Sequence, residues 1–182
     1  MQSKMKISLL FVVVLLVTGC SSPFMKPADF TLKPDGNHAV VNFLRPSSFG
    51  GAIMFGIWDR TEFVGVVTAK NYVQYKAKPG NHFFMARAEN WSGIKADVRA
   101  GKNYYILVEP RMGAWKARVN MSVLQPSDPR LAKWMQKLKP ITPIPEKRDG
   151  YVAERIDHVK KATKNFESGS VPHSVMKASD GR

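Results

Sequence analysis

Cysteine is almost absent from this sequence of 182 residues, which contains only Cys20. A single thiol cannot pair within its own chain, so a scaffold stabilised by internal disulfides is excluded. Metal ligands are also sparse, because the four histidines have no zinc-ligand spacing among themselves or with the cysteine. They are His38, His82, His158 and His173. We therefore expect no metal site and no other cofactor.

Acidic residues and long hydrophobic runs are the other shortages. The chain has 14 Asp and Glu against 28 Lys and Arg, a formal net charge of +14. Its most apolar stretch, from Ile7 to Val17, covers only about half of a ~30 Å bilayer core at the helical rise of ~1.5 Å per residue. A permanent transmembrane helix is therefore not expected there.

The first twenty residues have the order of a secretory signal. Lys4 and Lys6 precede the apolar stretch, and Val17-Thr18-Gly19-Cys20 follows it. A charged start, an apolar centre and small residues at the end are typical of a cleaved signal peptide. The tetrapeptide resembles the lipobox of bacterial lipoproteins, in which the cysteine becomes the acylated first residue of the mature protein. The resemblance predicts lipidation of Cys20, with palmitate among the acyl chains.

The residue after the cysteine and the charge balance indicate location and partners. Ser21 stands where an Asp would be the usual inner-membrane retention signal in enteric-type bacteria, so the resemblance implies an outer-membrane lipoprotein facing the periplasm. Loss of residues 1–19 removes two lysines and leaves a charge of +12. An exported protein meets phospholipid, lipopolysaccharide and peptidoglycan anions, so nucleic acid is not an expected partner. Alternatively, the surplus only keeps the surface soluble.

Composition and periodicity divide the chain into five segments. We expect a signal peptide over 1–19, a lipidated tether over 20–37, a β domain over 38–126, a helical extension over 127–167 and a disordered tail over 168–182. The tether is rich in Pro, Gly, Ser, Lys and Asp, and the tail has few residues that could be buried.

The β domain is predicted from apolar residues that recur with a period of two between turn residues. The last strand shows this best, because Val119, Met121 and Val123 alternate with Asn120 and Ser122. One buried face and one wet face indicate a small antiparallel β-sandwich. The expected strands are 39–44, 52–58, 62–68, 72–77, 82–89, 94–98, 104–109 and 115–124.

Two helices are predicted in the extension. The first follows a cap at Ser127 or Asp128, has Pro129 in its first turn and ends before Pro140. The prolines at 140, 143 and 145 then break the chain. The second helix, Glu146 to Phe166, carries one apolar stripe that we expect to be buried on the β domain or in a groove of another envelope protein. The stripe is Val152, Ile156, Val159 and Phe166.

Catalytic signals are weak. No serine lies in a nucleophile elbow and no glycine-rich loop opens a helix, so we expect no catalytic residue. A pair of carboxylates for glycoside hydrolysis is the remaining enzymatic alternative. The acidic residues available in the β domain are Asp59, Glu62, Glu89, Asp97 and Glu109. Trp91 lies in the polar stretch 89–93 and is the aromatic residue that we expect to be exposed for binding sugars or bases.

Three short motifs carry a further resemblance. They are Arg45-Pro46-Ser47 at a strand end, Pro79-Gly80-Asn81-His82 at a turn, and Gly101-Lys102-Asn103-Tyr104-Tyr105 at a strand start, with Gly65 between the first two. Over residues 38–124 the chain resembles an uncharacterised family of bacterial lipoprotein β domains. The resemblance implies a prealbumin-like β-sandwich with a C-terminal helical extension beyond the family pattern. It supplies no catalytic residue, and it adds Arg45 and Tyr104 to Trp91 as binding candidates.

These observations together predict a membrane-anchored, non-enzymatic binding or assembly component of the bacterial cell envelope. Its partner would be an envelope protein. The alternative is a binder of anionic polymers or glycans, such as lipopolysaccharide or peptidoglycan, that uses a basic and aromatic surface.

Overall fold

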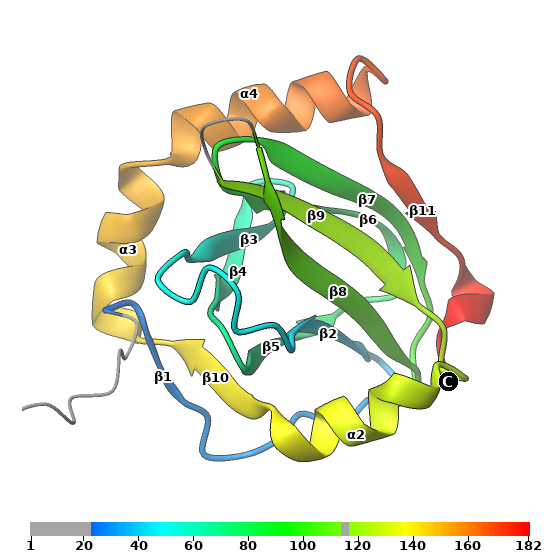
Figure 1. Ribbon diagram of the computed structural model, residues 1–182. Helices are drawn as coiled ribbons and strands as arrows, with labels where there is room; N and C mark the ends of the chain where they lie inside the picture. Colours follow the sequence, from blue (N-terminus) through cyan, green and yellow to red (C-terminus); the bar gives the residue numbers. More distant parts are fainter. Residues whose placement is uncertain (1–22, 114–116) are drawn as a thin grey trace, which may run out of the picture.

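The computed structural model describes residues 23–113 and 117–182 and is mainly β (Figure 1). The described strands are β1 (Met25–Pro27), β2 (Ala39–Arg45), β3 (Phe55–Asp59), β4 (Glu62–Val67), β5 (Asn71–Ala77), β6 (Gly80–Arg87), β7 (Trp91–Val98), β8 (Asn103–Met112), β9 (Ala117–Leu124), β10 (Lys139–Pro143) and β11 (Ser174–Met176). The helices are α2 (Pro129–Lys137), α3 (Pro145–Ala153) and α4 (Ile156–Glu167), with a 3-10 turn, η2, at Ala178–Asp180.

The strands form two mixed sheets. One has the order β1-β10-β5-β2-β8-β9 and the other the order β11-β7-β6-β3-β4. The expectation of purely antiparallel sheets is wrong, because β2 pairs with β8, β10 with β5, and β11 with β7 in parallel. Two of these parallel pairs arise because the chain after β9 returns to both sheets, which a reading of local alternation does not reveal.

Both sheets contribute to one hydrophobic core. Phe43 of β2 and Phe84 of β6 meet with ring centroids 5.4 Å apart. A second, smaller cluster lies on the other face of the first sheet, where Leu131 and Leu138 of the α2 region cover Leu44. All seven residues of β2 are therefore buried, and this strand lacks the solvent-exposed face that we expected. Burial on both faces requires a layer outside the sheet, which α2 supplies.

The strands of the predicted β domain are confirmed within a few residues at their ends. The first residue of β7 is Trp91, so this side chain lies in a strand and not in an exposed loop. It is half-buried and packs against the main core. The expected strand 115–124 begins at Trp115, which lies outside the described residues. The inward positions that follow it, Val119 and Met121, are buried as predicted.

The described part of the expected tether is attached to the sheet. Met25 pairs with Pro143 in β10, is only 4% exposed, and accepts a hydrogen bond from the Val66 N–H through its sulfur. Further along, Leu32 N–H donates to the Gln74 side chain at 2.7 Å, and Asp35 forms an ion pair with Lys76. The expectation of a free tether is therefore wrong from residue 25 onward, because the backbone groups of β1 find partners in β10.

The helical extension contains both expected helical regions, with one difference. Asp128 caps α2 through a hydrogen bond from Arg130 N–H, as predicted. The second region is two helices, because the chain turns at Glu154 and Arg155 between α3 and α4. Val159 and Phe166 are buried on the β domain, and Val152 and Ile156 are half-buried. The apolar stripe therefore docks within the chain.

Two segments that we expected to be irregular are strands. The proline-rich stretch after α2 forms β10 between β1 and β5, because the fixed φ of proline is compatible with extended backbone. The expected disordered tail forms β11, and Met176 is fully buried there. Figure 1 shows the result: α2, β10, α3, α4 and β11 follow one another around the rim of the two sheets. Within the described ranges, no helix is both long and apolar enough to cross a bilayer.

Candidate functional site

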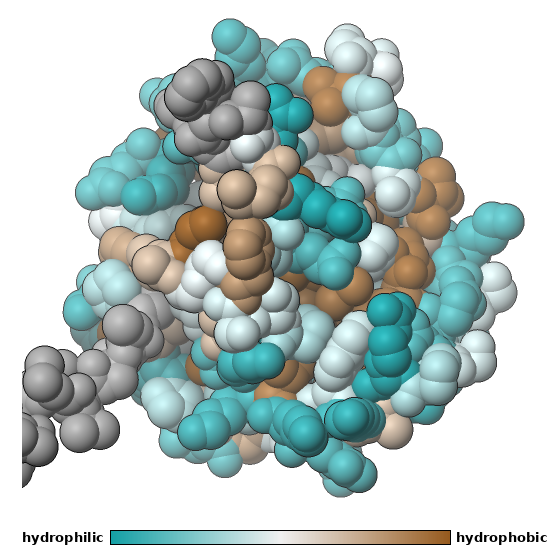
Figure 2. Space-filling model, viewed as in Figure 1, coloured by the Kyte–Doolittle hydropathy of each residue, from teal (hydrophilic) through white to brown (hydrophobic). Residues whose placement is uncertain are grey.

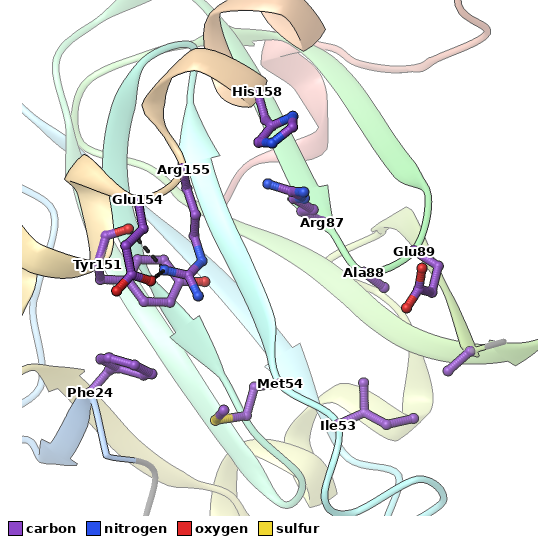
Figure 3. Close-up of a pocket in the computed structure, with 11 residues that line it drawn as sticks. Phe24, Ile53, Met54, Arg87, Ala88, Glu89, Tyr151, Glu154, Arg155 and His158 are labelled. Carbon is purple, nitrogen blue, oxygen red and sulfur yellow. Dashed lines mark hydrogen bonds and ion pairs between the residues drawn. The ribbon is translucent and has the colours of Figure 1, made fainter.

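A hollow in the described surface lies where several segments distant in the sequence meet. The end of β6 and the residues after it form one side, the α3–α4 turn forms another, and Phe24, Ile53 and Met54 complete it (Figure 3). Its volume is about 590 Å³. We call this hollow the basic pocket, because Arg87, Arg155 and His158 all line it.

The three basic side chains reach the basic pocket from different elements. Arg87 is the last residue of β6, and Arg155 and His158 come from the turn before α4 and its first turn. In Figure 3 the side chains of Arg87 and His158 lie on one side of the space and Arg155 lies on the other. No periodicity relates Arg87 to Arg155 and His158, so only the packing of α4 against β6 brings it to them.

The two arginines differ in how their charge is used. The Arg155 guanidinium donates to Glu154 at 2.6 Å and to the Tyr151 carbonyl at 3.2 Å, and it lies over the Tyr151 ring at 4.0 Å. The Arg87 guanidinium stacks on the Trp91 ring at 5.5 Å and forms no ion pair or hydrogen bond with any described residue. Arg87 therefore keeps its donors available to a ligand in the pocket.

Tyr151 forms an aromatic wall. Its ring contacts Phe24 and Phe63, each with a centroid separation of 4.8 Å. Burial raises the pKa of Tyr151, while the charges of Arg155 and Arg87 act in the opposite direction. The hydroxyl is therefore protonated at neutral pH and can donate a hydrogen bond. Close approach of this ring requires Gly56, because a Cβ there would lie 2.5 Å from the Tyr151 hydroxyl.

The lining of the basic pocket combines cationic, acidic, aromatic and apolar side chains. Its two carboxylates, Glu89 and Glu154, are exposed, and Glu154 is paired with Arg155. The described lining contains no Ser, Thr or Cys side chain that could act as a nucleophile. Guanidinium, phenol and imidazole groups beside apolar side chains are suited to an anionic group attached to a larger molecule.

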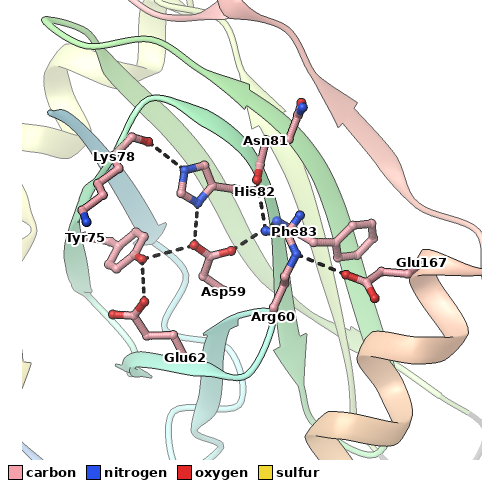
Figure 4. A network of polar contacts seen from close by, with 9 residues as sticks. All are labelled: Asp59, Arg60, Glu62, Tyr75, Lys78, Asn81, His82, Phe83 and Glu167. Carbon is pink, nitrogen blue, oxygen red and sulfur yellow. Dashed lines mark hydrogen bonds and ion pairs between the residues drawn. The ribbon is translucent and has the colours of Figure 1, made fainter. Parts of the chain in front are cut away.

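A second polar site lies around His82 (Figure 4). His82 Nδ1 is 2.5 Å from Asp59, and Nε2 is 2.8 Å from the carbonyl of Lys78. Both partners present oxygen acceptors, so these contacts favour the protonated ring, in which both nitrogens donate. Burial lowers the pKa of His82, but the hydrogen bond and charge of Asp59 and the Lys78 carbonyl outweigh it and raise the pKa above its usual value. A histidine with both nitrogens engaged cannot act as a general base.

The same network brings together two of the acidic residues that we considered for glycoside hydrolysis, Asp59 and Glu62. The Tyr75 hydroxyl lies 3.1 Å from Asp59 and 3.0 Å from Glu62. Burial and the two carboxylate charges raise the pKa of Tyr75. Asp59 is 7% exposed and also accepts from Phe83 N–H, so it is used to join β3, β5 and β6. Of the other acidic residues, Asp97 and Glu109 pair with nearby arginines on the surface.

The predicted binding residues have structural partners. Arg45 is completely buried, and its guanidinium donates to the carbonyls of Phe49, Gly50 and Ile53. Tyr104 is also fully buried and donates to the Ala178 carbonyl of the C-terminal segment at 3.3 Å.

The remaining two predicted residues are Cys20 and Trp91. Cys20 lies outside the described residues. Trp91 is half-buried and reaches the basic pocket only through its stacking with Arg87. Two other residues weighed from the sequence line the pocket, Glu89 as a carboxylate and His158 as a metal ligand, but no sequence signal indicated Tyr151 or Arg155.

Comparisons with known proteins add no relative: no family model, curated protein or solved structure matches this chain. Within the described residues, no group of three or more His, Cys, Asp or Glu side chains could hold a metal ion.

Proposed function

We propose that this protein is a lipid-anchored component of the bacterial cell envelope that acts by binding an anionic group in the basic pocket. The anchor is Cys20, exposed by removal of residues 1–19, and the membrane is the outer membrane. The fold is a β-sandwich, and the two sheets that share the Phe43–Phe84 core support this part of the proposal. The prealbumin-like class is proposed from the three sequence motifs alone.

One observation carries the binding function. Arg87 lines the basic pocket, and no described residue supplies a carboxylate or carbonyl to its guanidinium. A guanidinium that is half-buried and lacks an acceptor gains most from an anionic ligand, because charge-assisted hydrogen bonds replace those it would make with water. Tyr151 and His158 can add donors from neighbouring walls.

Titration of the full-length protein in detergent with inorganic pyrophosphate tests the proposal. Arg87→Ala should weaken binding by about tenfold or more, since hydrogen bonds to charged groups contribute about 1.5–3 kcal/mol each. Lys133→Ala is the matched control, because Lys133 is exposed on α2, does not line the pocket and carries the same unit charge. Absence of binding by the wild type, or equal loss in both variants, would contradict the proposal.

A further inference from the structure

We propose that the face around the basic pocket lies directly on the membrane, and that the pocket takes the phosphate of an anionic phospholipid headgroup. This inference rests on the proposed function and adds to it the source of the anion and the orientation of the domain. It follows from the length of the chain before β1, from the positions of exposed apolar side chains, and from the charge of the pocket.

The first argument is chain length. Phe24 follows Cys20 by four positions, and an extended chain spans at most about 3.3–3.6 Å per residue, so the acylated cysteine would lie within about 15 Å of Phe24. Phe24 lines the basic pocket, and its carbonyl accepts a hydrogen bond from Ile144 N–H at 2.9 Å. With Met25 buried in the next position, the start of β1 is fixed to the domain. A lipid on Cys20 therefore brings the pocket close to the bilayer.

The second argument is the position of exposed apolar side chains. Among the described residues, five large hydrophobic side chains are exposed, and three of them belong to segments beside the basic pocket. Met54 lines the pocket, Phe49 lies in the same loop and is 54% exposed, and Met112 is 79% exposed opposite Ala117, another lining residue. Figure 2 shows tan and brown side chains over the loop between β2 and β3, with teal surface around them.

This loop is held in one shape from inside. The buried Arg45 guanidinium donates to three carbonyls of the loop, those of Phe49, Gly50 and Ile53, and lies over the Phe55 ring at 4.6 Å. The exposed Phe49 side chain is therefore presented on a backbone that is already ordered. Insertion of its ring among headgroups then loses less conformational entropy than insertion of a free loop. Arg45 is a positioning residue for this contact.

The third argument is complementarity. The lining also holds Glu89 and Glu154, and Glu154 pairs with Arg155, but no described carboxylate pairs with Arg87. The Arg87 guanidinium in the hollow and the apolar side chains at the rim match a lipid surface, where acyl chains lie beneath phosphate groups. The predicted mature charge of +12 favours the same surface. A headgroup phosphate held by Arg87 and His158 would place Phe49 and Met54 toward the acyl region, in agreement with the anchor position.

A depth measurement tests the orientation. The full-length lipoprotein is reconstituted in vesicles as Phe49→Cys and, separately, as Val175→Cys, each labelled with bimane; acylation of Cys20 leaves the introduced thiol as the reactive one. Val175 is the control, because it is 59% exposed on β11, away from the pocket. Lipid-attached nitroxide should quench the label at 49 severalfold more than the label at 175. Equal quenching, or none at 49, would overturn the orientation.

The source of the anion is tested with the same label. The bimane at position 49 should be quenched more strongly in vesicles of phosphatidylcholine with phosphatidylglycerol than in vesicles of phosphatidylcholine alone. Arg87→Ala should remove this difference, and Lys133→Ala should keep it. If Arg87→Ala keeps the difference, the pocket does not take a lipid phosphate and the inference is wrong. If the protein binds pyrophosphate in detergent but the quenching does not depend on anionic lipid, this inference is wrong while the proposed function stands. If the protein neither binds pyrophosphate nor responds to anionic lipid, both the inference and the proposed function are wrong.

Discussion

At Gly56 the absence of a side chain decides how closely α3 approaches the second sheet. A Cβ at this position would lie 2.5 Å from the Tyr151 hydroxyl, well inside van der Waals contact. Gly56→Ala should therefore displace Tyr151 and lower the free energy of unfolding by about 1–3 kcal/mol, as overpacking of a core does. Thermal unfolding monitored by circular dichroism measures this. Gly36→Ala is the control, since nothing lies within 4 Å of its Cβ, and an equal effect there would contradict the explanation.

The His82–Asp59 pair makes stability depend on pH. Because the pKa of His82 is raised in the folded state, the pair stabilises the protein fully below the unfolded histidine pKa of about 6.5. This stabilisation is lost as pH rises from there through the folded pKa. The melting temperature should therefore fall over that range, and His82→Asn should flatten the dependence. A His82→Asn profile that falls as steeply as the wild type would show that another group is responsible.

Among the secondary-structure elements, β11 is the one that the sequence least suggests. It is three residues long, yet Met176 is fully buried in the main core while its neighbour Val175 is 59% exposed. Met176→Ala should destabilise the protein by about 2–5 kcal/mol, because the cavity is added to the lost burial. Val175→Ala should change stability by about 0.5 kcal/mol or less. Denaturant unfolding of the two variants checks this, and similar midpoints would mean that β11 is not held in solution.

Two elements, the α3–α4 pair and β10, differ from what the sequence predicts. The prediction of one helix from 146 to 166 was sound in its periodicity, but the chain turns at Glu154 and Arg155 so that α3 and α4 can follow two sides of the molecule. Prolines in β10 argued against a strand, yet its positions are compatible with the fixed φ of proline. Whether a segment forms a strand or a helix ends at a given residue depends on the elements packed beside it, and the propensity of the segment's own residues carries no information about them.

For the whole molecule, anchoring through Cys20 is the central prediction. Cys20→Ala should abolish incorporation of radiolabelled palmitate and release the protein from the membrane fraction, because stable residence requires acyl chains that only this thiol can initiate. Detergent phase partitioning of both proteins provides the readout. Continued labelling of the variant, or a soluble wild type, would refute the lipoprotein prediction and with it the proposed function.

The sequence by itself determined features that depend on near neighbours. Alternating apolar residues predicted the strands from β2 to β9, and a cap at Ser127 or Asp128 predicted α2. The tetrapeptide ending at Cys20 predicts the anchor, which stays a prediction. Each rests on a few consecutive residues whose backbone or chemical preference is set locally.

Only the tertiary structure decided which elements and side chains distant in the sequence lie next to one another. It attached β1, which begins five positions after Cys20, to β10. It also brought Arg87 to Arg155, 68 positions further along the chain. Neither arrangement leaves a period or a spacing in the sequence. Both come from the burial of side chains between elements that are distant in the chain, and that burial is a property of the whole core.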